Sequence, residues 1–103
     1  MSLNQRQVAA TRTELATNLA LSGQSVAGVA VTLGRSESEI RSALDVDGQP
    51  REVWLLRDYL ERMIRSTGGT PHPYSSLTEE SRAAAQGWFQ LFDVDEVLNR
   101  AAR

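Results

Sequence analysis

Apolar residues recur along this chain at the three- to four-residue spacing of amphipathic helices. The pattern and its flanking cap residues predict six helical segments. They cover residues 4–21, 25–33, 36–45, 50–65, 79–86 and a short final segment that begins after Asp93. No stretch shows the alternation of a β-strand, and no internal repeat is present. We therefore expect an all-α protein, a compact helical domain of about five to six helices.

Residues that start or stop helices separate these segments. Gly34 permits a tight turn, because glycine adopts the left-handed conformation at little cost. Ser36 is predicted to cap the next helix, and Pro50 suits the first position of the helix after that. Near the C-terminus, Thr78 is predicted to cap a helix that Gly87 interrupts. These local signals fix where the helices should begin and end.

One segment divides the chain. Residues 66–76, STGGTPHPYSS, contain two glycines and two prolines, which cannot continue a helix and favour an extended path. We expect a single domain over residues 1–103, in which this proline- and glycine-containing linker leads to a C-terminal helical segment, residues 78–103. The chain is long enough for one modest core.

Residues 25–45 have the pattern of a DNA-binding helix-turn-helix. Small and apolar residues give the first helix a buried face, and Ile40, Ala43 and Leu44 give the second helix another. Helical geometry then turns Ser38 and Arg41 outward. The arginine is suited to guanine, and the serines to phosphates or bases. The candidate DNA contacts are Arg35, Ser36, Ser38, Arg41 and Ser42.

The charge balance leaves a second function open. The chain has 11 basic residues, all arginine, against 13 acidic ones, so its formal net charge is -2. Firm DNA binders neutralise roughly 6–10 phosphates, so any DNA binding here must come from a local patch. The leading hypothesis is a helix-turn-helix transcriptional regulator. The alternative is a helical protein-interaction or dimerisation module that binds no nucleic acid.

Aromatic residues suggest a partner surface. Trp54 falls among the charged residues of the segment over 50–65, not on its apolar face. Three further aromatic residues add a large apolar surface to so small a domain: Trp88, Phe89 and Phe92. We expect a homodimer to which these four aromatic residues contribute. Burial of the same residues within one chain is the competing interpretation.

Catalytic and metal-binding patterns are missing from the sequence. There is no cysteine, and the one histidine, His72, lies between two prolines with no acid beside it. We expect no enzymatic activity, no cofactor and no metal. No apolar run is long enough to span a membrane, and the N-terminus lacks the order of a secretory signal. The expected location is therefore the cytoplasm.

A set of short blocks, in order, carries a family resemblance. The blocks are MSLNQ, ELATNLALSG, VWLLRDYL, GGTPHPY and GWF. Together they resemble a family of small uncharacterised bacterial proteins that is catalogued as a domain of unknown function. The resemblance covers almost the whole chain. It implies a bacterial origin and a helical fold with a helix-turn-helix-like centre, and it brings no activity, cofactor or catalytic residue.

Overall fold

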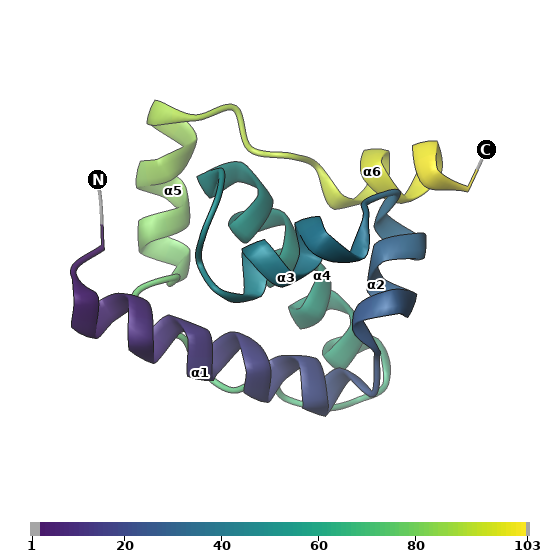
Figure 1. Cartoon of the computed structure of the whole chain (residues 1–103), viewed down its shortest axis with the longest axis horizontal. Helices are drawn as coiled ribbons and strands as arrows, with labels where there is room; N and C mark the ends of the chain where they lie inside the picture. Colours follow the sequence, from purple (N-terminus) through teal and green to yellow (C-terminus); the bar gives the residue numbers. More distant parts are fainter. Residues whose placement is uncertain (1–2, 103) are drawn as a thin grey trace.

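The computed structural model describes residues 3–102, and these residues form six helices and no strand (Figure 1). The helices are α1 (Gln5–Ser22), α2 (Val26–Leu33), α3 (Glu37–Leu44), α4 (Pro50–Ser66), α5 (Glu79–Trp88) and α6 (Val94–Ala101). The all-α prediction is confirmed, and the predicted segments match these helices closely. None of the helices in this range combines the length and the apolar composition that crossing a membrane requires.

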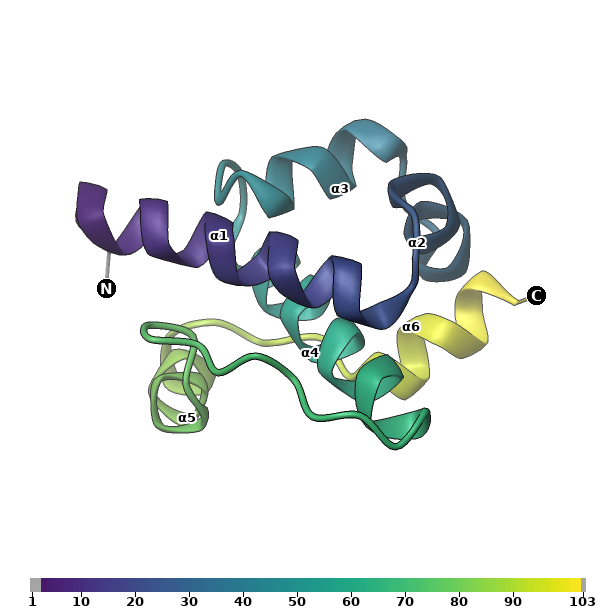
Figure 2. The same cartoon turned by 90° about the horizontal axis from the view of Figure 1, so that it is seen from below.

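Helix α4 lies at the centre of the molecule. It packs against α1, α3 and α6, and the segment that follows it crosses back over one of its sides (Figure 2). Its buried residues lie around most of the helix: Val53, Trp54, Leu55, Leu56, Arg57, Tyr59, Leu60 and Ile64. The sequence pattern predicted a surface helix with one solvated face, whereas the structure covers much of that face and leaves Arg62 and Arg65 exposed.

The expectation that Trp54 projects outward is wrong. Its side chain is only 6% exposed and belongs to the hydrophobic core. The guanidinium of Arg57 lies over the indole, with its central carbon 5.7 Å from the ring centre, and Leu77 lines the same cavity as Trp54. The structure therefore buries Trp54 within the single chain, which was the competing interpretation, and does not leave it free for a dimer interface. The chain itself covers the side of α4 on which Trp54 lies.

The predicted helix starts are found in the structure. The Ser36 hydroxyl accepts a hydrogen bond from the backbone N–H of Glu39, and the Glu39 carboxylate accepts one from the N–H of Ser36, so the capping box is complete. Pro50 occupies the first turn of α4. The predicted interruption at Gly87 is wrong, because α5 continues through it to Trp88. One glycine costs a helix only about 1 kcal/mol, which the hydrogen bonds of the surrounding turn offset.

The linker is held to α1 by two buried polar side chains. The amide of Asn18 donates to the carbonyl of His72 at 3.0 Å and accepts from its N–H at 2.7 Å. The carboxylate of Glu14 accepts from the N–H of Ser75 at 3.2 Å. These contacts satisfy backbone groups that a helix or sheet would otherwise pair. The exposed His72 therefore holds its place through its backbone and not through its imidazole.

Candidate functional site

The α2–α3 unit, residues 26–44, consists of two short helices joined by a tight turn. Gly34 has a φ of 67°, and the N–H of Arg35 reaches back to the carbonyl of Ala30 at 2.8 Å. This is the hydrogen-bond pattern that closes helices with a glycine in the left-handed conformation. The buried residues that hold the two helices together are Val29, Ala30, Leu33, Ile40 and Ala43.

Helix α6 supports this turn from outside the unit. A Cβ atom at Gly34 would lie 3.3 Å from the Cβ of Ala101, a tight contact that would require α6 to shift by a few tenths of an ångström. Helix α6 also packs against α2 over several residues. The sequence pattern gave no sign of this contact, because 67 positions separate Gly34 from Ala101. The C-terminal helix therefore helps to fix the orientation of α2, and through α2 that of α3.

The outer face of α3 carries the predicted contact residues in its middle. Ser38 and Arg41 are exposed, and Ser42 is half-buried. Among residues 3–102, no acidic side chain forms an ion pair with Arg41. Helix α1 adds a second cation here, since the Nε of Arg12 donates to the backbone carbonyl of Asp45 at 2.8 Å. Arg12 was missed in the sequence, because its partner lies 33 residues away.

The two predicted residues at the turn have other partners. The Nε of Arg35 lies 3.0 Å from a carboxylate oxygen of Glu52, and its guanidinium lies over the ring of Phe92 at 5.1 Å. A further nitrogen of Arg35 donates to the carbonyl of Leu33. The hydroxyl of Ser36 caps α3. The structure thus directs Arg35 toward α4, while Ser38 and Arg41 stay on the open face.

Acidic residues flank the outer face of α3. Glu37 and Glu39 occupy its first turn, where their negative charges interact favourably with the positive end of the helix dipole. Hydrogen bonds from the backbone and the hydroxyl of Ser36 hold the pKa of Glu39 below its usual range, so this carboxylate is charged at neutral pH. Asp45 and Asp47 are exposed beyond the other end. The cations of this face are therefore confined to its middle and to the end near Arg12.

The four aromatic residues do not form one surface. Trp54 is in the core, and Trp88 on α5 is 78% exposed. Phe89 and Phe92 are partly buried against the core. The ring of Phe92 lies under the guanidinium of Arg51 at 4.2 Å, a cation–π contact on the side of the molecule near α6. Trp88 is therefore the one of the four that offers most of its ring to a partner.

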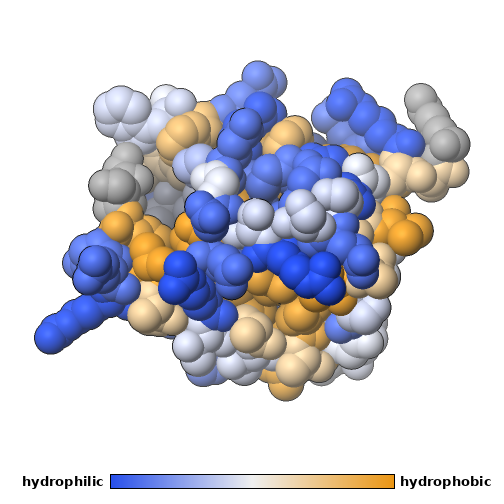
Figure 3. Space-filling model, in the orientation of Figure 1, coloured by the Kyte–Doolittle hydropathy of each residue, from blue (hydrophilic) through white to orange (hydrophobic). Residues whose placement is uncertain are grey.

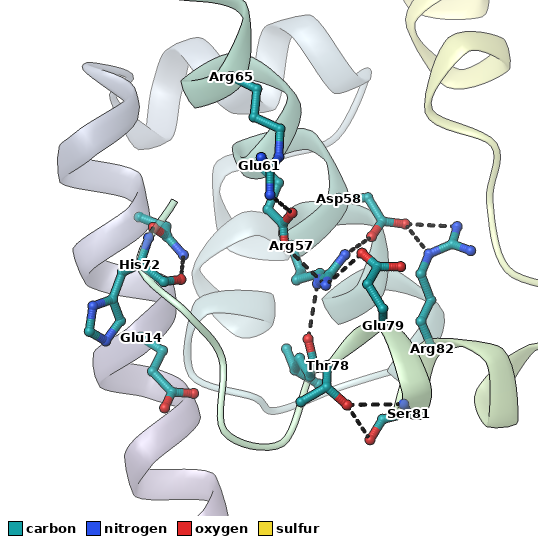
Figure 4. A network of polar contacts seen from close by, with 12 residues as sticks. Glu14, Arg57, Asp58, Glu61, Arg65, His72, Thr78, Glu79, Ser81 and Arg82 are labelled. Atoms are coloured by element: carbon teal, nitrogen blue, oxygen red, sulfur yellow. Dashed lines mark hydrogen bonds and ion pairs between the residues drawn. The ribbon is translucent and has the colours of Figure 1, made fainter. Parts of the chain in front are cut away.

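A charged cluster joins α4, the linker and α5 (Figure 4). At its centre Arg57, only 4% exposed, donates to the carbonyl of Leu77 at 3.1 Å. Its guanidinium also forms ion pairs with Asp58, Glu61 and Glu79 at 2.9, 2.9 and 3.1 Å. Burial disfavours its charge, but the three carboxylates outweigh burial and raise the pKa of Arg57. We call this set the Arg57 cluster.

Comparison with known proteins identifies the family. No curated protein and no solved structure shows significant similarity to the chain. A family described as "Uncharacterized protein conserved in bacteria (DUF2316)" matches residues 1–90, a range that includes α1 to α5. The resemblance found in the sequence blocks is thereby confirmed. The chain belongs to this family of uncharacterised bacterial proteins.

Proposed function

We propose that this protein binds DNA through the outer face of α3 and acts as a transcriptional regulator in the bacterial cytoplasm. The observation that carries the proposal is Arg41, an exposed cation without an ion-pair partner among residues 3–102, on a helix whose opposite face is fixed in the core. A helix presented in this way after a tight turn fits the width of the major groove. The role is one of binding, and no catalytic step is involved.

The contacts follow from the positions of the cations. Arg41 is placed for a bidentate contact with guanine, and Ser38, one turn before it, for a base edge or a phosphate. Arg12, which is exposed and held at the end of α3, is placed for a phosphate. One cation on a phosphate predicts a shallow salt dependence, with a slope of about -1 for the logarithm of the binding constant against the logarithm of the salt concentration.

Binding to DNA selected from a random duplex library at low salt tests the proposal. Arg41→Ala should weaken binding to the selected site by about 1–3 kcal/mol and relax the preference at one base pair. Arg12→Ala should weaken binding to all sequences alike. The control is Arg100→Ala, which removes an exposed arginine from α6 and should change neither.

Two results would contradict the proposal or part of it. Equal weakening of selected and random DNA by Arg41→Ala would reduce that residue to a phosphate contact. Absence of any binding by the wild-type protein at low salt would exclude the DNA-binding function. Fluorescence anisotropy with labelled duplexes measures both.

A second candidate function is a protein-interaction or dimerisation module. The observation that favours it is the acidic first turn of α3, since Glu37 and Glu39 would lie close to a DNA backbone of the same charge. The exposed indole of Trp88 supports it as well. This function predicts self-association or a partner protein without nucleic-acid binding.

A further inference from the structure

A cavity of about 340 Å³ lies between α5 and the rest of the molecule. The start of α1, the loop between α3 and α4, α4 itself, and α5 with the end of the linker form its walls. The surface is hollowed between α5 and that loop, and hydrophobic residues border the hollow (Figure 3). Among the described residues the lining is apolar apart from Ser76 and Ser81, and it contains no charged side chain.

Helix α5 stands apart from the bundle and forms one wall. None of its residues is buried, although Ala84, Ala85 and Trp88 face the cavity. Its charged anchors are at its beginning, where Glu79 pairs with Arg57 and Arg82 pairs with Asp58 at 3.0 Å. The second half of α5 therefore makes only partial contact with the core, through Ala85, and leaves part of its apolar side open. Protein interiors normally close such a gap by packing side chains into it.

The loop wall contains a strained residue. Val46 has a φ of 55°, a conformation that a β-branched residue rarely adopts. Its side chain lines the cavity and packs against the core. Strained backbone of this kind tends to occur at ligand sites, where a particular side chain is needed at a particular place. The strain is an observation independent of the cavity volume.

We infer that this cavity binds a neutral, mainly apolar small molecule with one or two hydrogen-bonding groups, such as a hydroxyl or a carbonyl. The volume lies at the lower end of the roughly 300–1,000 Å³ of ligand pockets. A charged ligand is disfavoured, because no counter-charge lines the cavity to offset the loss of water. Ser76 and Ser81 supply the hydroxyl groups for the polar end. The site is separate from the outer face of α3, so the inference stands or falls independently of DNA binding.

Both tryptophans of the chain, Trp54 and Trp88, line the cavity and serve as reporters. The probe is N-phenyl-1-naphthylamine, a neutral dye that becomes fluorescent in apolar surroundings and accepts energy from tryptophan. Titration should give saturable binding of one dye per chain, with quenching of tryptophan emission. 1-Decanol should displace the dye, and decanoate at pH 8 should do so about tenfold less well or worse, because its carboxylate finds no cation. Equal displacement by the two would overturn the assignment of a neutral ligand.

A cavity-filling variant locates the site. Ala84→Phe places a ring in the cavity and should weaken dye binding about tenfold or more. The matched control is Ala83→Phe, one position earlier on α5, which is exposed and does not line the cavity. It should bind the dye as the wild type does. Absence of saturable binding, or equal binding by the two variants, would overturn the inference.

A measurement on the wild-type protein covers the case in which Ala84→Phe does not fold. In two-dimensional NMR, 1-decanol should shift the indole N–H signals of Trp54 and Trp88. The backbone signals of Leu21 and Val31, exposed apolar residues that do not line the cavity, should stay in place. Shifts confined to Leu21 and Val31, or no shift at all, would show that the cavity is not a binding site.

Discussion

At the scale of single residues, the end of α3 joins a common hydrogen-bonding pattern to an unusual residue. The N–H of Val46 bonds to the carbonyl of Ala43 at 3.0 Å, and the N–H of Asp47 to that of Ser42 at 2.8 Å. This paired closure of a helix needs a left-handed residue, which is usually glycine. Helix α2 ends in the same way at Gly34. The apolar contacts of the Val46 side chain therefore compensate for the strain of its left-handed backbone conformation.

Substitutions at Val46 test this balance between backbone strain and side-chain contacts. Both Val46→Gly and Val46→Ala remove the apolar contacts, but only glycine also relieves the left-handed strain, which costs other residues roughly 1–2 kcal/mol. After the entropic cost of glycine in the unfolded chain, Val46→Gly should be more stable than Val46→Ala by about 0.5–1 kcal/mol. Urea unfolding followed by circular dichroism measures the difference. The usual order, with alanine more stable than glycine, would show that Val46 carries no strain.

At the scale of elements, α4 depends on charges that the rest of the chain covers. Figure 4 shows Asp58 and Glu61 of α4 close to Arg57, with Glu79 and Arg82 reaching them from α5. The side chains of Asp58 and Glu61 are only 10% and 16% exposed. Charges this deeply buried are stable only when they are paired, because water no longer solvates them. The Arg57 cluster is therefore what ties the linker and α5 to the central helix.

Removal of the arginine should break this tie. Arg57→Ala removes the donor to the carbonyl of Leu77 and one ion-pair partner from each of three carboxylates, so we expect the free energy of unfolding to fall by about 3 kcal/mol. The control is Arg65→Ala, whose exposed guanidinium pairs with Glu61 at 3.5 Å and should contribute less than about 1 kcal/mol. Hydrogen exchange should also become faster in α5 with Arg57→Ala. Equal effects of the two variants on unfolding would contradict the role of the cluster.

The helices were predictable from the sequence because their signals are local. Ser36 and Pro50 act within a few residues of their own position, and the outward position of Arg41 follows from the helical period alone. The burial of Trp54 and the pairing of Arg35 depend on residues at least 17 positions away or on other helices. A charged stripe on α4 looks the same in sequence whether water or α5 covers it. The sequence therefore predicts helices and outward residues, and not which polar faces the fold covers.

At the scale of the whole molecule, the exposed large apolar side chains lie on separate elements. Val31 on α2 and Trp88 on α5 are each 78% exposed, and Leu21 at the end of α1 is 54% exposed. Scattered single residues of this kind are common on monomers. A tryptophan is different, because so large a ring gains more than other side chains from being covered. Trp88 is therefore the residue on which the predicted homodimer depends.

Sedimentation velocity at micromolar concentration tests the homodimer, which would also let two copies of α3 meet two half-sites of DNA. Trp88→Ser should weaken the dimer without loss of helicity, because the indole is exposed in the single chain. Val31→Ser, equally exposed on another helix, is the matched control and should leave the dimer intact. Trp54→Ala should instead lower the free energy of unfolding by about 3–5 kcal/mol, as expected for a buried aromatic residue. A wild-type protein that sediments as a monomer throughout would exclude the homodimer, and an equal effect of Val31→Ser would move the interface away from α5.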